Sequence, residues 1–169
     1  MGLDARVRCN CIKEGKTAPF PFPGRLAFDK CGDPFLLSQN EVAAEAMLES
    51  EDMSELHVFD QWEYNLGCGH DDGLLAAARI GNMALVAHIR GWINACADAT
   101  KQAFPALLEK VVYSGTHCGD CIDSAQAGVL LRELETLAPL AQDELHREFV
   151  DTMTKLCEAS IASGNPIVF

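Results

Sequence analysis

Three short segments of the chain carry cysteine and histidine residues at close spacing. They are Cys9-Asn10-Cys11, Cys68-Gly69-His70 and His117-Cys118-Gly119-Asp120-Cys121. Thiolate sulfur and imidazole nitrogen are ligands that zinc prefers, and a structural zinc site needs four of them in a tetrahedron. One interpretation of the chain is therefore a metal-binding protein or metalloenzyme with zinc or iron bound by residues 9–11, 68–70 and 117–121. The ligands expected for that site are Cys11, Cys68, His70, His117, Cys118 and Cys121.

The same cysteines allow other interpretations. Free cysteines often pack as small apolar groups. Cys9 and Cys11 on one strand would point to the same face, so burial in the core explains them as well as metal binding does. Cys118 could also act as the nucleophile of a thiol enzyme, with His70 or His117 as its base. The Cys-Gly-Asp-Cys motif has the spacing of a thioredoxin-type redox site, but a thioredoxin fold needs further strands where this chain predicts two helices.

The charge of the chain is concentrated in one segment. The whole sequence has 13 Lys and Arg against 25 Asp and Glu, for a formal net charge of -12. Residues 31–78 hold eleven of these carboxylates and no Lys or Arg. Protein surfaces usually mix both signs, so this run indicates a binding surface for a basic protein. The acidic balance argues against nucleic acid and anionic membranes as partners.

The leading interpretation is a non-enzymatic cytoplasmic binding protein that engages a basic partner through residues 31–78. Its contacts are expected to come from the carboxylates Glu45, Glu49, Glu51, Asp52 and Glu55. The cytoplasm is expected because the first residues lack the apolar run of a signal peptide and no stretch is apolar enough to span a membrane. No residue pattern assigns a catalytic group.

The elements that would position these residues follow from apolar periodicity and turn chemistry. The sequence predicts one mainly helical α+β domain over residues 1–169, with about five to six helices and a small sheet. Strands are predicted at residues 3–12, at the β-prone 111–114 and at the apolar tail 165–169, which is expected beside the first strand. Helices are predicted at residues 38–49, 82–99, 104–110, 123–137 and 142–163.

Three further segments have less regular patterns. Residues 17–23 alternate Phe and Pro, which predicts an extended arm that buries its rings. Residues 51–66 fit a helix in their first half and a strand in their second half. Residues 67–73 contain three Gly and two Asp, which predicts a loop.

Several segments together resemble a small family of bacterial proteins that has no assigned activity. The segments are Met1-Gly2-Leu3-Asp4, Cys9-Asn10-Cys11, Phe59-Asp60-x-Trp62, the run from Tyr113 to Asp120, and the tail Gly164-Asn165-Pro166-Ile167-Val168-Phe169. The resemblance covers the whole chain and implies neither catalytic residues nor a cofactor. In size and charge the chain is also similar to immunity proteins that neutralise secreted toxins, which makes a toxin one candidate for the basic partner.

Overall fold

A computed structural model describes residues 2–37, 53–117 and 119–169. Contacts within the chain divide it into two compact units. Unit 1 comprises Met1–Arg8 and Leu75–Phe169, and unit 2 comprises Cys9–Leu74. The single domain expected over residues 1–169 stays a prediction, because two compact units can still unfold in one transition.

The sheet of unit 1 has four strands in the order β4-β1-β6-β5. The strands are β1 (Gly2–Arg8), β4 (Leu74–Asn82), β5 (Cys121–Ile122) and β6 (Ile167–Val168). The tail strand β6 runs antiparallel to both β1 and β5, with Val168 opposite Arg6 on one side and Cys121 on the other. This pairing confirms the small sheet that joins the N-terminal strand to the apolar tail.

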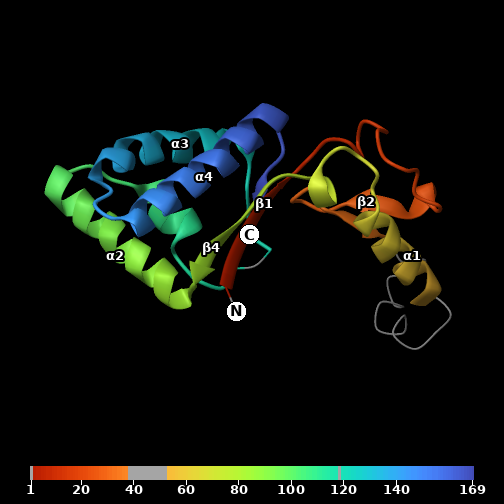
Figure 1. Ribbon diagram of the computed structural model, residues 1–169, viewed down its shortest axis with the longest axis horizontal. Helices are drawn as coiled ribbons and strands as arrows, with labels where there is room; N and C mark the ends of the chain where they lie inside the picture. Colours follow the sequence, from red (N-terminus) through yellow and green to blue (C-terminus); the bar gives the residue numbers. More distant parts are fainter. Residues whose placement is uncertain (1, 38–52, 118) are drawn as a thin grey trace. The chain divides into compact units, whose positions relative to one another are not determined.

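Three long helices gather beside β1 and β4 in Figure 1. They are α2 (Met83–Thr100), α3 (Ser124–Leu137) and α4 (Glu144–Ser163). Each begins at a polar side chain that accepts a backbone N–H three residues on, and these capping residues are Asn82, Asp123 and Asp143. Such caps satisfy N–H groups that have no partner within the helix. Helix α4 ends at Gly164, whose φ of 75° is the left-handed conformation that favours glycine.

One core joins these elements. Alternate residues of β1 enter it, because successive side chains of a strand point to opposite faces: Leu3 and Val7 are fully buried. The helices contribute apolar stripes, and the largest fully buried side chains among them are Ile89, Ile93, Leu130, Leu134, Leu137, Met153 and Leu156. The mainly helical α+β architecture predicted from periodicity is therefore confirmed.

Unit 2 is smaller and has less regular structure. It contains the hairpin of β2 (Leu26–Phe28) with β3 (Pro34–Leu36), helix α1 (Met53–Tyr64) and the short 3-10 helices η1 (Pro23–Arg25) and η3 (Asp71–Gly73). Its main described hydrophobic cluster has four buried members, Phe20, Phe59, Trp62 and Leu66. Cys9, Cys11 and Cys31 are also buried in this unit. The Trp62 Nε1–H donates to the carbonyl of Ala18 at 2.7 Å, which fixes the Phe-Pro arm of residues 17–23 against α1.

Several local predictions were wrong. Strand β1 ends at Arg8, so Cys9 and Cys11 lie in the following turn. Residues 111–114 do not form a strand, because Val111 closes the π-helix η4 (Leu107–Val111) and a bend follows. Strand β4 was not predicted, since its run of alanines lacks the β-branched residues typical of strands.

The less regular segments have mixed outcomes. The ambiguous residues 51–66 contain the helix α1, and the loop predicted at 67–73 contains only one short turn of 3-10 helix. In the Phe-Pro arm Phe20 is buried, whereas Phe22 is 36% exposed. The helix predicted at 38–49 lies outside the described residues.

We expect Asn165→Ala to destabilise the protein by about 1–3 kcal/mol, because it removes a buried donor. The Asn165 Nδ2 donates to the Arg8 carbonyl at 2.8 Å and so fixes the tail against the end of β1. Equilibrium unfolding in urea measures the change. Asn94→Ala is the control, since Asn94 donates to the Arg90 carbonyl on the exposed side of α2. Equal stability losses in the two variants would contradict a special role for the tail contact.

Candidate metal centre

Two of the three predicted Cys and His segments meet in unit 2. The ligand atoms of Cys9, Cys11, Cys68 and His70 all lie within 4.8 Å of one another. The Cys9 and Cys68 sulfurs are 3.9 Å apart, and the Cys11 sulfur is 3.5 Å from His70 Nδ1. Since Cys9 and Cys68 are 59 residues apart in the chain, only the fold brings these segments together.

These two separations match those of a tetrahedral zinc site. With Zn–S bonds of about 2.3 Å and a Zn–N bond of about 2.1 Å, a regular tetrahedron places two sulfurs about 3.8 Å apart and a sulfur and a nitrogen about 3.6 Å apart. The observed separations of 3.9 and 3.5 Å differ from these by about 0.1 Å. The cysteines of the cluster are free thiols in the structure, so each sulfur can bind a metal.

Local backbone hydrogen bonds shape the two ligand segments. The Lys16 N–H donates to the Cys11 carbonyl at 2.8 Å, which closes the turn that follows β1. The Cys9 N–H donates to the Gly73 carbonyl at 2.9 Å and so joins the first segment directly to the second. Gly73 has a φ of 69°, a conformation that glycine adopts without strain. The backbone thus holds both segments together independently of the side chains.

The electrostatics of the cluster favour a cation. Hydrogen bonding to the Cys9 thiol, followed by burial, raises the pKa of Cys11 to about 11. This raised pKa keeps the Cys11 thiol protonated at neutral pH, and a bound cation would favour its thiolate. Cys9 and Cys11 are buried, Cys68 is half-buried and His70 is exposed, which leaves one side of the cluster open to an entering ion.

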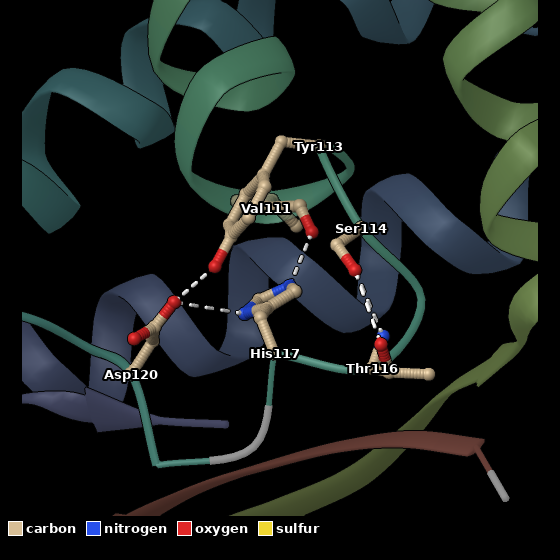
Figure 2. Close-up of polar contacts among 6 residues, drawn as sticks. All are labelled: Val111, Tyr113, Ser114, Thr116, His117 and Asp120. Carbon is tan, nitrogen blue, oxygen red and sulfur yellow. Dashed lines mark hydrogen bonds and ion pairs between the residues drawn. The ribbon is translucent and has the colours of Figure 1, made fainter.

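The third predicted segment belongs to unit 1, where His117 makes different contacts (Figure 2). Its Nε2 donates to the Val111 carbonyl at 2.8 Å, and its Nδ1 lies 3.7 Å from a carboxylate oxygen of Asp120. The Tyr113 hydroxyl donates to the same oxygen of Asp120. The rings of Tyr113 and Phe169 pack against the buried imidazole, with centroids 4.5 and 4.8 Å away. The imidazole of His117 therefore lies between the Val111 carbonyl and the Asp120 carboxylate.

The two cysteines of this segment have different outcomes. Cys121 lies in β5 and is half-buried beside β6. Cys118 lies outside the described residues, so its proposed roles as a ligand and as the nucleophile of a thiol enzyme stay predictions.

Cys9 belongs to the cluster although it was not among the six ligands expected from the sequence. A signal for it was present: Cys-x-Cys and Cys-x-His each offer two ligands at the same spacing, and together they supply the four that zinc needs. The site expected from the sequence included residues 9–11, and of its two cysteines only Cys11 was predicted as a ligand.

The structure describes only part of the acidic segment 31–78. Of the five carboxylates expected to contact a partner, Glu45, Glu49, Glu51 and Asp52 lie outside the described residues. Glu55 forms an ion pair with Arg25, and the two side chains are 23% and 16% exposed. The binding of a basic protein by residues 31–78 stays a prediction.

Comparison with known proteins gives no match: no protein-family model matches the chain, and no curated protein or solved structure is significantly similar to it. The resemblance to a bacterial family stays a prediction. None of the helices in the described parts of the chain is both long and apolar enough to cross a membrane.

We expect Asp120→Asn to lower the pKa of Tyr113. The pKa of Tyr113 is raised to about 12, mainly by its hydrogen bond to Asp120. Ionisation would remove the proton that Tyr113 donates to the carboxylate, so this bond stabilises the neutral hydroxyl. In the variant the pKa should fall toward the ordinary value of about 10. Tyrosinate absorbance measures it in a Tyr64→Phe background, where Tyr113 is the only tyrosine. An unchanged titration would show that the hydroxyl does not donate to Asp120.

Proposed function

We propose that this chain is a zinc-binding protein in which Cys9, Cys11, Cys68 and His70 hold one structural zinc ion. The observation that carries the proposal is the convergence of three sulfurs and one imidazole nitrogen within 4.8 Å. Three soft sulfur ligands and one imidazole favour zinc over magnesium or calcium, which prefer oxygen ligands. His70 would bind through Nδ1, the nitrogen nearest to Cys11.

The ligand count supports a structural role over a catalytic one. Catalytic zinc sites keep one of the four positions for water or substrate, whereas structural sites fill all four with protein ligands. Four protein ligands are present here, so a bound ion would have no position left for a reacting molecule. The proposal accordingly assigns no catalytic residue to this centre.

A bound zinc ion would stabilise unit 2 by cross-linking its two ends. Cys9 is the first residue of the unit, and His70 lies shortly before its last residue, Leu74. The hydrophobic cluster described between them has four buried members, with four partly buried side chains packed against it, which is small beside the core of unit 1. A cross-link that closes a loop of this size contributes about 4 kcal/mol by restricting the unfolded chain. A zinc ion that holds both ends would supply a cross-link of this kind.

Protein purified without chelator or His tag should contain one equivalent of zinc per chain. Cys11→Ser should lose most of it, because serine replaces a thiolate ligand. Cys96→Ser is the matched control, since Cys96 is a half-buried cysteine of α2 in unit 1 and does not belong to the proposed zinc site. Elemental analysis by mass spectrometry measures the metal. Equal zinc content in the two variants would refute the ligand assignment.

A chelator should loosen unit 2 while leaving unit 1 folded. Trp62 reports on the core of unit 2, and Trp92 packs against the core of unit 1. In a Trp92→Phe background, removal of zinc should shift the Trp62 emission to longer wavelength, because water reaches the indole. Far-ultraviolet circular dichroism should retain most of the helical signal, which comes from α2, α3 and α4. Unchanged Trp62 emission after complete metal removal would argue that zinc is not structural.

Zinc binding should release about three protons per ion at pH 7, because the three cysteine thiols must each lose one. The raised pKa of Cys11, about 11, means that its proton is still present throughout the range from pH 6 to 8. Zinc affinity should therefore fall as the pH falls. Calorimetric titrations in buffers of different ionisation enthalpy count the protons. Release of one proton or fewer would be incompatible with three thiolate ligands.

A further inference from the structure

Unit 1 contains a second cluster of ligand-type side chains, which shares no residue with the zinc centre. His88 lies on α2, Asp143 caps α4, and His146 lies in the first turn of α4. One ligand atom from each of the three lies within 4.8 Å of the others. His146 Nδ1 and Asp143 Oδ1 are 3.1 Å apart. Two helices separated by more than forty residues of sequence thus contribute to one cluster.

The buried member of this cluster has unused ligand capacity. The side chain of His146 is only 9% exposed; its Nδ1 lies 3.1 Å from Asp143 Oδ1, whereas its Nε2 has no hydrogen-bond partner within the described residues. Buried polar atoms normally have partners, because losing water without a replacement costs free energy. A nitrogen in this condition is suited to binding an ion. The stacked ring of Trp92, with its centroid 4.1 Å away, covers one face of the imidazole and fixes its orientation.

We propose that His88, Asp143 and His146 form a second site, which binds a divalent first-row transition ion such as Ni²⁺ or Zn²⁺. Two imidazoles and one carboxylate are a ligand set that such ions accept. Three protein ligands leave coordination positions for water, so this site is open, in contrast to the closed zinc centre of unit 2.

The chemistry of each group suits this role. A neutral imidazole offers a lone pair to a metal, and the His146 ring has a nitrogen within 4.8 Å of ligand atoms of both His88 and Asp143. Asp143 Oδ1 accepts the His146 N–H at 2.9 Å, and the carboxylate has a second oxygen with which to bind an ion while it keeps this cap. The His88 ring lies parallel to that of His146, with centroids 5.4 Å apart. His88 is exposed and can rotate about its side-chain bonds to direct a nitrogen at the ion.

The test adds Ni²⁺ to full-length protein that has first been loaded with one equivalent of zinc. Calorimetry should detect one further equivalent of Ni²⁺. The bound ion should also quench tryptophan emission, because the paramagnetic centre would lie next to the indole of Trp92. His88→Gln should weaken this binding by about tenfold or more, since it removes one of three ligands. His57→Gln is the matched control, because His57 is an exposed histidine of α1 in unit 2.

A second variant separates metal binding from helix capping. Asp143→Asn keeps an oxygen that can cap α4 but removes the charge that attracts the ion, so the fold should persist while Ni²⁺ binding weakens. Failure of the wild type to bind Ni²⁺, or equal binding by His88→Gln and His57→Gln, would overturn the proposal. Neither outcome bears on the zinc centre, because the protein is zinc-loaded before the titration and the two sites share no residue.

Discussion

The convergence of three thiols and one imidazole is the contact that brings the two ends of unit 2 together. The hairpin, helix α1 and the arm that carries Phe20 pack around a described hydrophobic cluster with four buried members. Hydrophobic burial on that scale is small beside the conformational entropy of ordering the segment. The ligand segments come from the beginning and the end of the unit, and the hydrogen bond from Cys9 to Gly73 already joins them. An ion at this position would stabilise the closed form of the whole segment.

Unit 1 has a different basis of stability. A continuous apolar core joins its sheet to three capped helices, and the tail strand β6 lies between β1 and β5. His117, Tyr113 and Asp120 make polar contacts in the loop that precedes β5, and Asn165 secures the tail. The described hydrophobic cluster of unit 1 is thus much larger than that of unit 2. The cluster of His88, Asp143 and His146 lies in the well-packed unit, where the helices can hold its groups without a metal.

Sequence reasoning predicted the parts of this fold that have strong local signals. The helices α2, α3 and α4 follow from apolar periodicity, and the tail strand follows from its apolar residues. The structure shows that Asn82, Asp123 and Asp143 cap these helices. Strand β4 was missed because its alanines carry no strand preference and only its pairing with β1 makes it a strand. Its position in the sheet is a property of tertiary structure, which local patterns do not contain.

The candidate site was predicted in outline only. Close spacing within each segment identified Cys11, Cys68 and His70, but nothing local showed which two of the three segments meet. That information lies in a contact between residues 59 positions apart.

The most direct test of the proposed zinc centre is X-ray absorption spectroscopy at the zinc edge of the purified protein. The proposal predicts about three sulfur neighbours near 2.3 Å and one nitrogen near 2.0–2.1 Å. A shell made only of oxygen and nitrogen neighbours, or the absence of stoichiometric zinc, would contradict it.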